Sequence, residues 1–111
     1  MKAEEFAEHT LTVASKFRWI KRIESKVFRN RVRVRLWLNN SFVDIYYNSE
    51  EEIVSYAYVE EGRRLFGANN MRIGWHLHPF GEVERHVPTK PVTIEEFLEM
   101  LEKELRKRGK I

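Results

Sequence analysis

Residues 31–48 read RVRVRLWLNNSFVDIYYN, and they carry the strongest indication of the fold in this sequence. From Val32 to Leu38 every second residue is aliphatic, and the residues between them are basic or aromatic. This period of two predicts a β-strand over residues 31–38 with one face in the core. Because Asn tolerates the positive φ of a tight turn, Asn39-Asn40 predicts a hairpin into a second strand.

The predicted turn fixes which residues of the two strands face each other. With Leu38 opposite Ser41, the buried face pairs Leu36 with Val43, Val34 with Ile45 and Val32 with Tyr47. The outer face then pairs Trp37 with Phe42, Arg35 with Asp44 and Arg33 with Tyr46. Every outer pair is aromatic, ionic or cation–π, so both faces support the same register.

The flanking segments complete an α+β pattern. Residues 2–14 have helical spacing, and strands are predicted at 53–59 and 63–67, joined by a turn at Glu61-Gly62. Thr93 and Glu96 form a capping box at the start of a second helix that ends near Gly109. We therefore expect residues 1–111 to form one α+β domain, a single antiparallel sheet of about four to six strands with an N-terminal and a C-terminal helix packed on it. The apolar stripe predicted for the second helix is Ile94, Phe97, Leu98, Leu101 and Leu105.

Composition excludes several classes of protein. With no cysteine, the 111-residue chain has no disulfide framework, thiolate metal site or cysteine nucleophile. No apolar run approaches the roughly 18 residues of a membrane span, and no signal-peptide pattern opens the chain, so we expect no membrane association and a cytoplasmic location. Sixteen Glu against a single Asp, with no Gln, is typical of a thermophile.

The net charge of +3 hides a strong separation of charge along the chain. Residues 16–35 hold nine basic side chains and only Glu24 as an acid, whereas residues 44–61 hold six acids and no base. A basic sheet face with aromatic rings between the charges suits single-stranded RNA. Two alternatives stay open, the surface ion network of a heat-adapted protein and a docking face for an acidic partner. The predicted binding residues on this face are Arg31, Arg33, Arg35, Trp37 and Tyr46.

Any chemistry is expected in the histidine segment. Residues 74–80 read GWHLHPF, and His86 follows. In an extended chain His76 and His78 project to the same side, which suits a shared divalent metal with His86, Glu82 or Glu84 as a third ligand. They also suit metal-free cleavage, in which one His takes the proton of a ribose 2′-hydroxyl and another protonates the leaving oxygen. In a third interpretation these histidines are hydrogen-bonded rim residues beside the core anchors Trp75 and Phe80.

The chain resembles the TumE-type toxins of prokaryotic toxin–antitoxin pairs. The resemblance covers roughly residues 42–101, and its strongest element is the Asn-containing turn followed by Gly74-Trp75-His76-Leu77-His78-Pro79. It implies a small antiparallel-sheet domain and a protein partner, an antitoxin encoded by an adjacent gene. The site residues that it implies are Tyr47, Asn48, Arg64, Asn69, Asn70, Trp75, His76, His78 and His86.

Three functional hypotheses follow. The first is a toxin-like ribonuclease that requires no cofactor, with His76, His78 and His86 in acid–base roles and Arg64 on the phosphate. The second is a non-catalytic protein-binding or RNA-binding module that an acidic partner neutralises. The third is a metal-dependent phosphoesterase with a divalent metal on the three histidines. A hairpin-rich sheet with an exposed edge also makes a homodimer an expectation.

Overall fold

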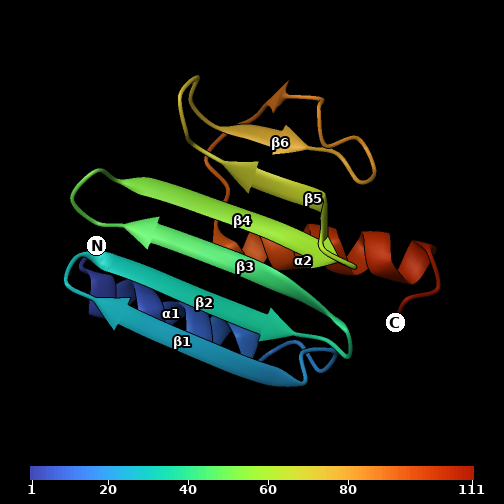
Figure 1. Ribbon diagram of the computed structural model, residues 1–111, viewed down its shortest axis with the longest axis horizontal. Coiled ribbons are helices and arrows are strands. Elements are labelled where there is room, and N and C mark those ends of the chain that lie inside the picture. The colour runs from blue at the N-terminus through green and yellow to red at the C-terminus, as the bar shows by residue number, and fades with distance from the viewer.

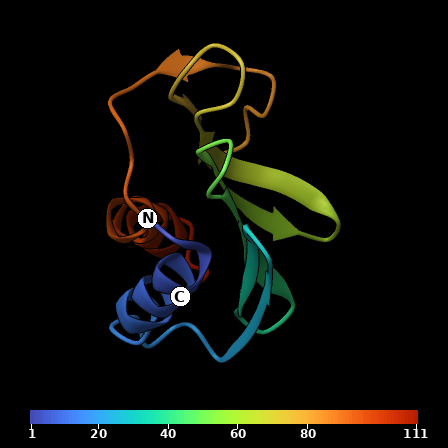
Figure 2. The same ribbon diagram turned by 90° about the vertical axis from the view of Figure 1, so that its left-hand side faces the viewer.

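A computed structural model describes residues 1–111, with two helices on one face of a seven-stranded antiparallel sheet (Figure 1). Figure 2 shows both helices on the same side of the sheet, so its other face has no helix cover. This confirms the predicted α+β fold, with more strands than expected. The elements are α1 (Ala3–Ala14), β1 (Arg22–Phe28), β2 (Arg31–Trp37), β3 (Ser41–Asn48), β4 (Ile53–Glu60), β5 (Arg63–Asn69), β6 (His76–His78), β7 (Val87–Pro88) and α2 (Ile94–Lys107).

The strand count exceeds the prediction because the last two strands are very short. β6, where the sequence predicted an extended segment, has three residues, and β7 has two, which is too few for an alternating pattern to appear. The strands lie side by side in chain order from β1 to β7, so each one pairs with the next. No helix has the length and apolar character needed to cross a membrane.

The predicted register of the β2–β3 hairpin is confirmed at every pair. On the helix side Leu36 lies opposite Val43, and on the other face Trp37 lies opposite Phe42. The aliphatic side chains of β2 that face the helices have no exposed surface, whereas its arginines lie on the helix-free face. We call this helix-free face the outer face. It carries the basic side chains of β2 and, four strands further along, the first two histidines of the segment.

Helix α2 closes the core behind the last strands. The Thr93 hydroxyl accepts a bond from the Glu96 backbone N–H at 3.1 Å, and the Glu96 carboxylate accepts one from the Thr93 N–H at 2.9 Å. The predicted apolar stripe is buried completely or nearly so. The Phe97 ring lies 5.1 Å from Tyr56 of β4 and 5.3 Å from Phe66 of β5, so α2 supports the two strands beside the histidine segment.

Candidate functional site

Strand β6 carries His76 and His78 onto the outer face. In the sheet register His76 lies opposite Asn69 and His78 lies opposite Gly67, while Leu77 between them faces the core. The sequence prediction that both imidazoles share one side of an extended strand is therefore confirmed. Unlike most outer-face residues, the two histidines are buried, with exposures of 4% and 5%.

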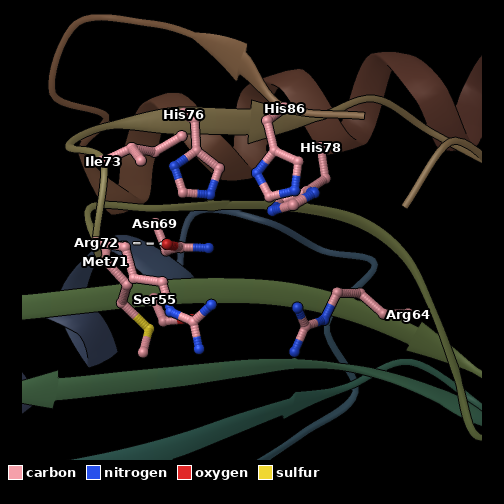
Figure 3. A pocket seen from close by; sticks show the side chains of 9 residues that line it. All are labelled: Ser55, Arg64, Asn69, Met71, Arg72, Ile73, His76, His78 and His86. Carbon is pink, nitrogen blue, oxygen red and sulfur yellow. Dashed lines mark hydrogen bonds between the residues drawn. The ribbon is translucent and has the colours of Figure 1, made fainter. Parts of the chain in front are cut away.

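His86 returns to this pair across the loop after β6. Its ring centroid lies 4.9 Å from that of His76 and 4.6 Å from that of His78, and those two centroids are 5.0 Å apart. The candidate ligand atoms of all three side chains lie within 4.8 Å of one another. The sequence left the direction of His86 open, and the structure brings it into the cluster (Figure 3). We call these three residues the histidine cluster.

Backbone carbonyl groups orient two of the rings. His76 Nδ1 lies 2.9 Å from the carbonyl oxygen of Gly74, and His78 Nδ1 lies 2.8 Å from that of Val83. Because a carbonyl oxygen can only accept, each Nδ1 carries the proton and donates it. In the neutral ring this leaves the Nε2 lone pair free, which is the arrangement of a metal-binding histidine held by a second hydrogen bond.

The environment of His78 favours its neutral form. Burial lowers the pKa of this imidazole, and the nearby His86, His76 and Arg64 lower it further, against the opposing effect of the Val83 carbonyl. A neutral imidazole is the form that binds a metal ion or accepts a proton.

The histidine cluster forms one wall of an open pocket of about 430 Å³ on the outer face. In Figure 3 the guanidinium groups of Arg64 and Arg72 point toward each other across the pocket from the two sides. No carboxylate lines it, so its charged side chains are basic or imidazole. Such a pocket suits an anion beside the imidazole groups. Its lining residues are Ser55, Arg64, Asn69, Met71, Arg72, Ile73, His76, His78 and His86.

A β-bulge places Arg64 in this pocket. Tyr58 pairs with Phe66, but the next residue, Val59, pairs with Arg64, so Leu65 is an extra residue in β5. Without the bulge, strict alternation would turn the Arg64 side chain toward the helices. Bulges commonly redirect a side chain in this way beside functional sites. The resemblance implied Arg64 as a site residue, whereas nothing in the sequence predicted the bulge.

Gly67 of β5 lies beside the pocket, at a position where a side chain does not fit. A Cβ at Gly67 would lie 2.9 Å from the carbonyl oxygen of Tyr56 on the neighbouring strand, which is closer than such atoms approach. Gly67 also lies directly opposite His78 and Ala57. A Cβ at Gly67 would also lie 3.8 Å from Cδ of Arg64, so glycine leaves room for the Arg64 side chain beside the histidine cluster.

Four residues implied by the resemblance have structural roles away from the pocket. Tyr47 faces the helices and stacks on Phe6 with ring centroids 4.2 Å apart. The Asn48 side chain accepts bonds from the backbone N–H groups of residues 50 and 51, and Asn70 accepts one from Val54, so both amides hold turns. Trp75 packs against the core. Asn69 does line the pocket, whereas sequence reasoning missed Ser55, Met71, Arg72 and Ile73.

The basic residues predicted to bind RNA lie on the outer face but not in this pocket. Asp44 forms ion pairs with Arg33 at 3.1 Å and Arg35 at 3.6 Å, as the ion-network alternative predicts. The guanidinium of Arg35 lies 4.4 Å from the centre of the Phe42 ring, and that of Arg33 lies 5.4 Å from the Tyr46 ring. Arginine side chains therefore cover the rings of Phe42 and Tyr46, on which we expected the bases of single-stranded RNA to stack.

Two rows of outer-face residues connect this basic area with the histidine cluster. Opposed residues of antiparallel strands point to the same face, so the pairings from β1 to β6 can be followed across the sheet. At about 4.8 Å per strand, β2 and β6 are about 19 Å apart. One row runs Lys26, Arg33, Tyr46, Ser55, Asn69, His76, and the other runs Glu24, Arg35, Asp44, Ala57, Gly67, His78.

Comparisons with family models, with curated proteins and with solved structures returned no significant match to this chain. The resemblance to TumE-type toxins therefore stays a prediction from the sequence.

Proposed function

We propose that the protein is a metal-dependent phosphoesterase whose divalent ion binds the histidine cluster. The observation that supports this most is the convergence of three imidazoles within 4.8 Å, two of them with Nδ1 bonded to a backbone carbonyl. Three protein ligands with one open position are typical of catalytic zinc. Ligand nitrogens on tetrahedral zinc are about 3.3 Å apart, so the cluster must contract on binding. His86, exposed and on a loop, is the ligand that is freest to move.

The pocket supplies the remaining requirements for phosphate ester hydrolysis. A divalent ion held by His76, His78 and His86 would supply a hydroxide nucleophile near neutral pH, so the pocket would need no carboxylate base. In the hydrolysis itself, the water would lose one proton to solvent as its oxygen bonds to phosphorus, the ester P–O bond would break, and the leaving oxygen would take up one proton from solvent. Arg64 and Arg72 are placed to stabilise the negative charge on the phosphate oxygens.

Arg64 gives the sharpest test of this activity. With bis(4-nitrophenyl) phosphate as substrate, we expect Arg64→Ala to lower kcat/KM by about 100-fold, because a guanidinium facing the developing charge is lost. Arg63→Ala is the matched control, since Arg63 is its exposed neighbour on β5 and does not line the pocket. Chelation should abolish hydrolysis and added Zn²⁺ or Mn²⁺ should restore it. Hydrolysis that survives chelation would contradict a metal mechanism.

The rows on the outer face favour a single-stranded RNA as the physiological substrate. A strand bound at the histidine cluster and crossing the sheet along the rows would reach Arg33 and Arg35, where phosphates compete with Asp44 for the guanidinium groups. RNA would bind this face mainly through contacts between its phosphates and the arginines. Base stacking would contribute little, because arginines cover the aromatic rings.

Arg33 separates the polymer from a small substrate. We expect Arg33→Ala to raise KM for an RNA oligonucleotide by about three- to tenfold and to reduce the salt dependence of binding by about one phosphate contact. The KM for bis(4-nitrophenyl) phosphate should not change, because this substrate is too short to reach β2. Arg106→Ala, on helix α2 behind the sheet, is the control. Equal effects of both variants on RNA would contradict a path along the rows.

Metal-free acid–base cleavage is the second candidate. It is favoured by the different environments of His78, which is buried, and His86, which is exposed, because paired histidines need different protonation states. This mechanism requires the ribose 2′-hydroxyl, so it predicts cleavage of RNA that resists chelators and no cleavage of the matching DNA.

The sequence resemblance supports a cellular role as the toxin of a toxin–antitoxin pair. Degradation of cytoplasmic RNA would arrest growth, and an acidic antitoxin could neutralise the protein by covering the basic outer face. A pull-down with the adjacent gene product addresses the partner separately from the chemistry.

A further inference from the structure

Strand β1 is the long free edge of the sheet. All seven residues from Arg22 to Phe28 are exposed, and β2 is the one strand beside it. The pairing with β2 runs without interruption over the whole strand, with no bulge and no proline. Natural proteins usually shorten, bend or cover such an edge, because its free N–H and C=O groups can bind another strand. The opposite edge, β7, has two residues and ends in Pro88.

The side chains of β1 add apolar surface to this open edge. Ile23 and Val27 point toward the helix side but remain 37% and 41% exposed, since α1 covers them only in part. Phe28 on the outer face is 68% exposed. Three exposed apolar side chains on a strand with one free edge indicate a surface that is covered when the protein is assembled.

We propose that β1 pairs with β1 of a second copy in an antiparallel, two-fold symmetric dimer centred on Ser25. A two-fold axis perpendicular to the sheet leaves every side chain on the same face in both copies. Residues that pair across the dimer must therefore share a face, and the residue at the axis lies opposite the same residue of the second copy. With Ser25 at the axis, Glu24 faces Lys26 of the second copy, and this ion pair occurs twice. On the helix side Ile23 faces Val27 of the second copy, also twice.

The neighbouring registers lack this complementarity. An axis through Glu24 places Arg22 opposite Lys26 of the second copy, which sets like charges against each other. An axis through Lys26 pairs Glu24 with Phe28, and Ser25 with Val27. The Ser25 register is the one that overlaps all seven residues and pairs Arg22 with the ring of Phe28 as well. Two antiparallel copies of the segment RIESKVF therefore complement each other in charge and apolar character, which favours a second copy as the partner of β1.

The dimer would join the two sheets into one and leave both histidine clusters free. Each cluster lies on β6 and the following loop, five strands away from β1 in its own protomer. The helices of both copies stay on one side, and the two outer faces form a continuous surface. This inference stands independently of the proposed enzymatic function, because none of the pocket residues belongs to β1.

Sedimentation equilibrium of the full chain tests the proposal through a charge reversal and its repair. We expect the wild type to give twice the 13.4 kDa mass of one chain. Lys26→Glu should raise the dimer dissociation constant by about tenfold or more, because carboxylates then face each other at two places. The double variant Glu24→Lys, Lys26→Glu should recover most of the lost affinity, because opposite charges face each other again, although Glu24→Lys loses the bond from Trp37 Nε1 and the ion pair with Arg22. Lys103→Glu makes the same charge change at an exposed residue of α2 and should leave the dimer dissociation constant unchanged.

Four results would overturn this dimer. A wild-type monomer at every concentration excludes the edge pairing, and so does a monomer that assembles only with the neighbouring gene product. A dimer that Lys26→Glu leaves unchanged uses another surface. Failure of the double variant to recover, with circular dichroism showing the wild-type fold, excludes the Ser25 register.

Discussion

Replacing His78 by Ala is expected to remove metal binding from the protein. His78 is a buried ligand of the histidine cluster, with its ring centroid 5.0 Å from that of His76 and 4.6 Å from that of His86, and its Nδ1 is held by the Val83 carbonyl. Loss of a hydrogen bond that only orients a ligand costs about 10- to 100-fold in metal affinity, so loss of the ligand itself should cost more than about 100-fold. Hydrolysis of the phosphodiester should fall with it.

The chain supplies its own control for this experiment. His9 is exposed on α1, on the opposite face of the sheet from the cluster, so His9→Ala should retain wild-type affinity and activity. Metal content is measured by mass spectrometry on untagged protein, and affinity by competition with a zinc indicator. Under the toxin proposal, His78→Ala should also end growth arrest whereas His9→Ala should not. Less than about half an equivalent of metal on the wild type would contradict the metal centre.

The sequence predicted the fold where local patterns and long-range pairing agree. In the β2–β3 hairpin the period of two, the Asn39-Asn40 turn and the cross-strand pairs all specify one register, and the structure has that register. Helix α2 is equally determined, since its capping box and apolar stripe define both its start and its buried face. A sequence specifies one structure when its local patterns, its turns and its long-range pairings all favour the same fold, as they do here.

The candidate site could be predicted only in part, because two features without a local pattern assemble it. The loop from Pro79 to Arg85 determines where His86 points, and no periodicity constrains a loop. The extra residue Leu65 turns Arg64 to the outer face, although plain alternation from Phe66 predicts the opposite. The spacing of His76 and His78 alone predicted that they share one side of β6. The positions of His86 and of the Arg64 guanidinium opposite the cluster depend on the tertiary structure.

The layers also show how the site depends on the core. The histidine cluster lies on short strands and loops, which have few backbone bonds of their own. Their position follows from β5, whose inner residues Phe66 and Ala68 are buried under α2 and its neighbours. A substitution that weakens the packing of α2 should therefore also disturb the histidine cluster, because β5 connects the two. By linkage, a metal ion that binds only the folded protein should stabilise the fold.

Leu101→Ala is expected to destabilise the fold by about 2–5 kcal/mol, because Leu101 has no exposed surface and its loss leaves a cavity between α2 and the sheet. Leu11→Ala is the matched control, since Leu11 is 37% exposed and also lies within a helix. It should cost less than about 1 kcal/mol. Urea denaturation with an unchanged m-value gives both free energies. If the two variants lose equal stability, α2 does not pack as described.

Metal binding connects this core prediction with the site. Free Zn²⁺ at 100 times its dissociation constant should add about 2.7 kcal/mol to the stability of any variant with an intact cluster. Leu101→Ala should therefore recover much of its loss when zinc is added, because the cavity lies on the far side of the sheet from the ligands. The double variant with His78→Ala should recover nothing. Equal recovery in both would place the zinc elsewhere on the protein, and recovery in neither would show that the three imidazoles do not hold it.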